Sequence, residues 1–180
     1  MKKKLIIIAL IGVNLISCQT PEEPRKPISQ QSGSYMKESS ERNRKIAKKE
    51  KEAILSLIKK DSLLEYNKSE NGFWYAYLEK NENDTITPKK GDQVIFTYNI
   101  FDLSGNEIYS KEELGEKEYY IDEEVIFSGL RLGLKLMKEK EKASFIFQSF
   151  KAFGTTGDRE KIPPNTPIQV NLELIEINPK

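Results

Sequence analysis

The sequence contains no histidine, and its single cysteine is Cys18. Without an imidazole or a second thiol, the chain cannot build Ser-His-Asp or Cys-His nucleophilic sites, the usual zinc sites or an internal disulfide. Carboxylate chemistry is open in principle, but no pair of acidic residues stands apart in an apolar stretch. An enzyme made from this chain should therefore run a reaction that needs little acid–base help.

The sequence also lacks an excess of either charge, with 29 Lys+Arg against 28 Asp+Glu. Removing residues 1–17, which carry three lysines and no acidic residue, leaves 26 basic and 28 acidic side chains and a formal charge of −2. Proteins that bind nucleic acid normally carry a basic excess, so we exclude that class of partner.

The only long hydrophobic run lies at the start, where three lysines precede an almost wholly apolar stretch from Leu5 to Ile16. It is too short to span a bilayer but has the size of a secretory signal core. Residues 15–18, LISC, resemble a bacterial lipobox, which predicts a lipoprotein signal peptide over 1–17 and lipidation of Cys18. The alternative is an ordinary signal peptide with an incidental cysteine. The lipobox predicts a lipid-anchored membrane protein of the cell envelope, facing the periplasm.

After this apolar run, the next segment has few apolar residues. Residues 19–34, QTPEEPRKPISQQSGS, are polar and rich in proline, and only one of the 17 aromatic residues, Tyr35, precedes Tyr66. Such a segment buries too little apolar surface to fold, so we expect a disordered tether over 18–38. The core must lie in the C-terminal two-thirds of the chain, with a boundary near residue 70.

Residues 39–66 predict an amphipathic helix, running from about 40 to 60 with Ser39 or Ser40 as its cap. Two apolar rows at helical spacing support it: Ile46, Ala53, Leu57 and Leu64, and Ala47, Ile54 and Ile58. Residues 38–61 hold eight basic and five acidic side chains. A solvated spacer or a helix packed on its own domain is the favoured interpretation, and docking on a partner or an anionic surface is the alternative.

After Gly72 the apolar period changes from helical to alternating, which predicts strands. The expected strands are GFWYAYLEK, VIFTYNIF, KEYYI, ASFIFQSF and IQVNLELIEI, with a hairpin turn at Ser104-Gly105. One short helix is expected in SGLRLGLKLMKEKEK, where Leu130, Leu134 and Met137 share a face. Four to six antiparallel strands with one helix predict an α+β domain, a curved sheet with the helix on one face.

The order and spacing of three segments resemble the FKBP-type peptidyl-prolyl cis-trans isomerases. They are GDQVIFTYNIFDLSGNEIYS, VIFSGLRLGLKLMKEKEKASF and AFGTTGDREKIPPNTPIQVNLELIEI. The resemblance covers about Ser69 to Ile177, within an expected isomerase domain of 69–180. The lipobox followed by RKPIS, SGSYM and SSERNRK is similar to the FKBP-type lipoproteins associated with bacterial gliding motility.

The resemblance implies catalysis of X-Pro rotation without cofactor or metal. Rotation breaks amide resonance at a cost of ~18–20 kcal/mol, and an apolar, water-poor pocket favours the less dipolar twisted amide. The expected partners are proline-containing segments of exported proteins, with the membrane reached through the lipid anchor and a motility or secretion complex as a possible wider setting. The alternative is a catalytically weak FKBP-like binding or chaperone module of an envelope complex.

The same resemblance implies the site residues. The catalytic set is Tyr98, Ile108, Phe127, Leu130 and Phe153, and the substrate-binding set is Tyr109, Tyr119, Ile162 and Val170. Phe127 should offer a backbone N–H to a substrate carbonyl. Gly154 and Gly157 should let the loop turn, and Pro163-Pro164 should stiffen its return.

Three positions depart from the family pattern, and each site residue has a plain alternative. Leu130 stands where many members carry tryptophan, Tyr109 where active members usually carry aspartate, and Phe153 where they carry tyrosine. The apolar pocket is therefore expected to survive without two of its polar groups, which predicts reduced activity. Apolar side chains on alternating strands also serve as ordinary core, and for Tyr119 and Val170 the two interpretations are evenly matched.

Overall fold

The computed structural model describes residues 29–180, so the predicted signal peptide, the lipidation site Cys18 and the first part of the tether lie outside the described residues. The chain divides into two compact units after Glu38, and residues 39–180 form the larger one. Within 29–180, no helix has the length and apolar content needed to cross a membrane.

Helix α2 runs from Ser29 to Lys60, so it begins about ten residues before the predicted cap. The prediction of a disordered tether is wrong for residues 29–38. This stretch contains no proline and consists largely of residues that tolerate a helix, with Gly33 as the one weak position. Asp61 then ends the helix, because its carboxylate accepts the backbone N–H of Leu63 at 2.9 Å. The helix therefore stops short of residue 66.

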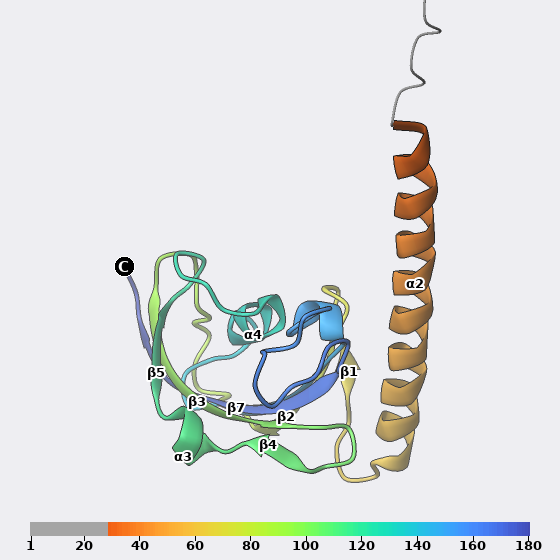
Figure 1. The fold of residues 1–180 in the computed structure, drawn as a ribbon. Helices are drawn as coiled ribbons and strands as arrows, with labels where there is room; N and C mark the ends of the chain where they lie inside the picture. Colours follow the sequence, from red (N-terminus) through yellow and green to blue (C-terminus); the bar gives the residue numbers. More distant parts are fainter. Residues whose placement is uncertain (1–28) are drawn as a thin grey trace, which may run out of the picture. The chain divides into compact units, whose positions relative to one another are not determined.

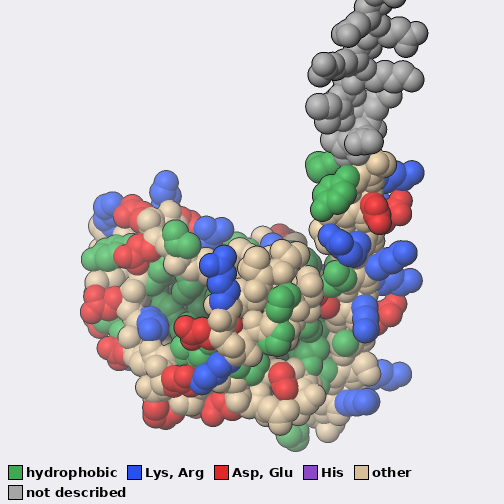
Figure 2. Space-filling view, viewed as in Figure 1, with side chains coloured by type: hydrophobic (Ala, Val, Ile, Leu, Met, Phe, Trp, Pro, Cys, Tyr) green, Lys and Arg blue, Asp and Glu red, His purple; other side chains and the backbone are tan. Residues whose placement is uncertain are grey.

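One face of α2 packs on its own domain. Ile54 is fully buried and clusters with Trp74 and Ile146, and Leu57 and Ile58 pack at the margin of this cluster. The eight basic side chains of residues 38–61 are all exposed. Figure 2 shows Lys and Arg side chains along the visible face of the helix. The packed interpretation therefore holds for the apolar face of the helix.

Seven strands within residues 29–180 form one antiparallel sheet, in the order β1-β2-β6-β7-β3-β4, with β5 also paired to β3 (Figure 1). Their bounds are β1 Asn67–Lys68, β2 Trp74–Glu79, β3 Gln93–Phe101, β4 Glu107–Tyr109, β5 Lys117–Tyr120, β6 Lys142–Phe147 and β7 Ile168–Asn178. The five predicted strands are all present. The two additional strands, β1 and β4, are too short to show a period.

The alternation that predicted β3 places Val94, Phe96, Tyr98 and Ile100 on the buried side. Because β3 lies between β7 and the shorter strands β4 and β5, this row faces the main hydrophobic core. The α+β class of the sequence-based prediction is confirmed, and Figure 1 shows a curved sheet with one short helix lying against it.

That helix, α4, covers only Ser128–Leu134, so the prediction that it continues through the lysine-rich segment is wrong. The chain leaves the helix through tight turns, in which the N–H groups of Leu136 and Met137 bond to the carbonyls of Gly133 and Leu134. Two further short helices, α3 at Lys111–Leu114 and the 3-10 turn η2 at Ser149–Lys151, were not predicted.

Glycine lets α4 approach the sheet closely. A Cβ at Gly129 would lie 2.6 Å from the Phe147 ring, and one at Gly133 would lie 3.1 Å from the Phe145 ring. The two phenylalanine rings are stacked at 5.8 Å beneath the helix. This close contact seats the start of α4, and with it Phe127, directly over the core.

Candidate active site

The structure brings all nine predicted site residues of the domain into one hydrophobic cluster. Tyr98, Tyr109, Tyr119, Leu130, Ile162 and Val170 are buried there, and Ile108, Phe127 and Phe153 are partly buried against it. They come from strands β3, β4, β5 and β7, from the start of α4 and from the loop after η2. Their contact with a substrate stays a prediction, since clustering alone is also what a core requires.

Two aromatic rings meet at the edge of this cluster. The ring centroids of Phe127 and Phe153 lie 5.1 Å apart, and Phe127 also makes an edge contact with Phe147 at 5.9 Å. Figure 2 shows hydrophobic side chains gathered in a recess on the visible face of the domain. Because Leu130 and Val170 are fully buried, an incoming chain would meet the partly exposed rings of Phe127 and Phe153 first.

Phe127 precedes the first residue of α4 in an extended conformation, with φ −63° and ψ 142°. Its carbonyl accepts the N–H of Arg131 at 3.3 Å. Its own N–H has no hydrogen-bond partner among residues 29–180. The backbone donor expected from the family resemblance is thus available to a ligand carbonyl.

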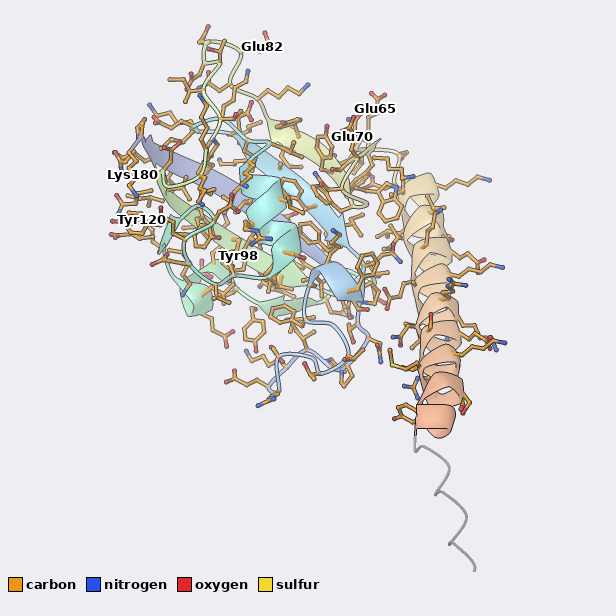
Figure 3. The ribbon with its side chains drawn as sticks, turned by 90° about the horizontal axis from the view of Figure 1, so that it is seen from above. Glu65, Glu70, Glu82, Tyr98, Tyr120 and Lys180 are labelled. Atoms are coloured by element: carbon orange, nitrogen blue, oxygen red, sulfur yellow. The ribbon has the colours of Figure 1, made fainter. Side chains whose placement is uncertain are left out.

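The hydroxyl of Tyr98 is a second available polar group. Tyr98 lies in the middle of the domain (Figure 3), and burial raises the pKa of its phenol above the ordinary value. The hydroxyl bonds to no other residue in the described part of the chain. The hydroxyl is not among the fully buried polar atoms that lack a partner, so a polar ligand atom would bond to it in place of water.

A polar contact that the sequence did not reveal joins Tyr109 to Asp158. The Tyr109 hydroxyl donates to Asp158 Oδ2 at 2.5 Å, across 49 positions of the chain. The hydrogen bond to this carboxylate is the main reason that the pKa of Tyr109 rises to about 12. Tyr109 still stands where active members usually carry aspartate, but the loop places the carboxylate of Asp158 against its hydroxyl.

Asp158 also organises its own loop. Its Oδ1 accepts the backbone N–H groups of Glu160 at 2.9 Å and Ile162 at 2.8 Å. Desolvation opposes the charge of Asp158, but the hydrogen bonds from Tyr109 and the two backbone groups together lower its pKa. An aspartate after a loop glycine is a common turn former, so the sequence held a signal for the local bonds but none for Tyr109.

The glycine at 157 is a structural requirement of the same loop. Gly157 has φ +68°, and a Cβ there would lie 2.1 Å from the carbonyl oxygen of Ile162. The loop is closed farther out by the N–H of Asn165, which donates to Gly154 O at 2.8 Å. These contacts hold Phe153 and Ile162 at the cluster, and their place at the rim of a prolyl pocket stays a prediction.

Tyr119 and Val170 behave chiefly as core. Tyr119 donates its hydroxyl to the carbonyl of Glu124 at 3.3 Å, which fixes the segment before α4. Val170 is fully buried in the central strand β7, opposite Phe145 and Ile100.

Among residues 29–180, no group of three or more acidic or sulfur ligands could hold a metal ion.

Comparison with known proteins gives a family and a fold. Residues 84–175 match the sequence profile of the FKBP-type peptidyl-prolyl cis-trans isomerases. A probable FKBP-type peptidyl-prolyl cis-trans isomerase of Haemophilus influenzae is 28% identical over 113 residues, which are 62% of this chain and 45% of that protein. The chain thus spans less than half the length of this relative.

Another relative carries a different description. The human protein described as inactive peptidyl-prolyl cis-trans isomerase FKBP6 is 38% identical over 56 residues, which are 31% of this chain and 17% of that protein. The match therefore concerns only part of the domain.

Two solved structures share the fold. FkpA from Escherichia coli superimposes with a TM-score of 0.61 at 21% identity, over 99% of this chain and 83% of that one. A peptidyl-prolyl cis-trans isomerase from Pseudomonas syringae gives a TM-score of 0.61 at 19% identity, over 75% of this chain and 95% of that one. At these identities the likeness establishes the fold.

Proposed function

The chain belongs to the FKBP-type peptidyl-prolyl cis-trans isomerase family, and from this premise we propose that it isomerises X-Pro bonds in exported proteins. The observation that carries the proposal is the grouping of the predicted site residues around two unpaired polar groups, the Phe127 N–H and the Tyr98 hydroxyl. An X-Pro segment offers the matching chemistry, an apolar ring beside a carbonyl acceptor.

The mechanism relies on differential solvation. The planar amide is more dipolar than the twisted amide at the top of the barrier, so an apolar site stabilises the transition state more than the ground state. Phe127, Phe153 and Leu130 pack together at this site, so they would exclude water from a bound prolyl ring. The Phe127 N–H would hold a substrate carbonyl while the adjacent bond rotates.

A second candidate function is a binding or chaperone module with little turnover. Tyr109 and Phe153 stand where active relatives usually carry aspartate and tyrosine, and a partial relative is described as inactive. The Tyr109 hydroxyl is already engaged by Asp158, so it offers less to a substrate than a free group would.

Two assays on the full chain separate these functions. One is a protease-coupled assay with an Ala-Leu-Pro-Phe type peptide, and the other is refolding of a protein limited by proline isomerisation, a step that takes ~10–100 s uncatalysed. An isomerase accelerates both. If the isomerisation rate equals the uncatalysed rate in both assays while a proline-containing peptide still binds, the binding module is the supported function.

The cellular setting is also a proposal. The lipobox-like sequence that ends at Cys18 supports an envelope protein held by lipid at a membrane. The segments RKPIS, SGSYM and SSERNRK, which are similar to gliding-associated lipoproteins, support a role in the gliding or secretion machinery. Cys18→Ser should block lipid attachment, because only a thiol is diacylated. We expect the variant to leave the membrane fraction or to remain an uncleaved precursor. An unchanged, membrane-bound mature form would refute the anchor.

A further inference from the structure

Helix α2 carries a buried carboxylate that the apolar rows of its sequence do not explain. Glu50 is 6% exposed, and no lysine or arginine in residues 34–180 pairs with it. Its Oε2 accepts the backbone N–H of Ser149 at 2.9 Å, and its Oε1 accepts the Ser149 hydroxyl at 2.6 Å. A buried charge is tolerated only where such bonds satisfy it, so this contact specifies where the helix meets the domain.

Ser149 connects this carboxylate to one wall of the candidate site. Its carbonyl accepts the N–H of Ala152 at 2.9 Å and the N–H of Gly154 at 2.7 Å. These two residues flank Phe153. The η2 turn, held from behind by Glu50, thus fixes the backbone on both sides of the Phe153 ring.

The same turn reaches the other wall. The hydroxyl of Ser128, the first residue of α4, donates to the carbonyl of Lys151 at 3.2 Å. Ser128 directly follows Phe127, whose ring lies 5.1 Å from that of Phe153. The η2 turn of three residues therefore makes hydrogen bonds beside both aromatic walls.

Near Glu50, no close apolar packing among the described residues joins α2 to the loop in addition to the Glu50–Ser149 hydrogen bonds. A cavity of about 330 Å³ lies between α2 and the end of the loop, lined by Ile46, Lys49, Glu50, Ala53, Asn165 and Pro167. The tight apolar contact of the helix, Ile54 with Trp74 and Ile146, lies one turn farther along. A second polar bond, from Gln148 Nε2 to the carbonyl of Ala47 at 2.7 Å, supports Glu50 from the neighbouring position.

We propose that Glu50 is a positioning residue for the prolyl site, through which helix α2, outside the family-matched region 84–175, fixes the distance between Phe127 and Phe153. The proposal rests on the isomerase or prolyl-binding function assigned to that site. Its consequence is that loosening Glu50 reduces the fraction of molecules with an assembled site, which weakens the apparent affinity for a proline-containing chain.

Three variants of the full chain test this role. Glu50→Ala removes both acceptors, Glu50→Gln keeps one oxygen without the charge, and Ser149→Ala removes the hydroxyl bond alone. Glu52→Gln is the matched control, because Glu52 lies on the same helix with its side chain 67% exposed. Emission of Trp74, the only tryptophan, reports whether α2 still packs at Ile54.

The first readout is amide hydrogen exchange. In Glu50→Ala we expect exchange at Ser149 and Gly154 to rise roughly tenfold to hundredfold, as loss of hydrogen bonds to a charged acceptor implies. Amides in the β6–β7 ladder should keep their protection. Equal acceleration everywhere would mean that Glu50 only stabilises the fold, and no change at Ser149 and Gly154 would refute the link itself.

The second readout is a split between KM and kcat. Glu50→Ala should raise KM for the peptide roughly tenfold with kcat nearly retained, and Glu50→Gln should recover part of the loss. A fall in kcat alone would overturn the positioning role. If the wild type shows no turnover, the isomerase assignment fails, and the dissociation constant of a proline-containing peptide takes the place of KM. If Glu50→Ala does not fold, Ser149→Ala replaces it, and we expect smaller changes of the same kind in amide exchange and in KM.

Discussion

Replacing Asp158 with alanine is the sharpest test of how the candidate site is held together. The carboxylate of Asp158 accepts the Tyr109 hydroxyl at 2.5 Å and the backbone N–H groups of Glu160 and Ile162 at 2.9 and 2.8 Å. Asp158→Ala removes all three bonds at once while leaving the hydrophobic cluster intact. We therefore expect the loop between Phe153 and Pro163 to open more often.

The magnitude follows from the kind of bond and its exposure. A hydrogen bond to a charged group contributes ~1.5–3 kcal/mol, and water or a neighbouring acceptor recovers part of the loss. Asp158 is half-buried, and Glu160 Oε2 already lies 3.4 Å from the Tyr109 hydroxyl. We expect the free energy of loop opening to fall by ~1.5–3 kcal/mol in total, which raises the open population roughly tenfold to hundredfold.

Loop opening can be measured as the rate of cleavage by trypsin, because Arg159 and Lys161 are exposed residues within the loop. When opening is fast relative to cleavage, the cleavage rate follows the open population, so cleavage after these residues should accelerate by the same factor. Asp84→Ala is the matched control, since Asp84 is also half-buried and accepts two backbone N–H groups, but in an exposed turn of another loop. Identical cleavage of Asp158→Ala and wild type, at matched folded fraction, would refute the reasoning.

Three further predictions concern the aromatic residues. Phe153→Tyr restores the hydroxyl of active relatives with little change in side-chain volume, so turnover should hold or rise by a factor that corresponds to ~0.5–1.5 kcal/mol. Loss of peptide binding in this variant would contradict the assignment of Phe153 to the prolyl site. Phe127→Ala removes the ring whose centroid lies 5.1 Å from that of Phe153, so it should weaken binding of a proline-containing peptide and lower the melting temperature. A folded variant with unchanged binding would show that Phe127 is only a core residue. The pKa of Tyr77 is raised to about 12 by burial, and that of Tyr109 to about 12 by its bond to Asp158. Their stabilisation is complete below the unfolded value near 10 and is lost as pH rises toward 12, so melting temperatures measured across this window should fall less steeply in Tyr77→Phe and Tyr109→Phe.

The sequence predicted those parts of the fold that follow a local period. Strands β3 and β7 alternate over nine and eleven residues, and both occupy the centre of the sheet where that alternation is obligatory. The start of α2 escaped prediction, because polar residues of good helix propensity resemble a tether in composition. The end of α4 escaped because its leucine spacing continues through a turn.

The apolar members of the candidate site could be predicted because the family resemblance places each of them in a recognisable segment. Its polar supports could not. Tyr109 and Asp158 are 49 positions apart, and Glu50 and Ser149 are 99 positions apart. Nothing in the local pattern distinguishes Asp158 or Glu50 from the other acidic residues, since their roles arise only when the fold brings distant backbone donors to them.

The position of β7 in the sheet has a consequence for how the protein is made. This strand follows the other described strands in sequence, lies between β6 and β3 and pairs with both over most of its length. A chain still emerging from the ribosome would present β3 and β6 as two unpaired edges, and such edges recruit other strands. Because β7 follows both of its partners in the sequence, the sheet closes only after residues 168–178 have been made, and until then the inner edges of β3 and β6 have no strand to cover them.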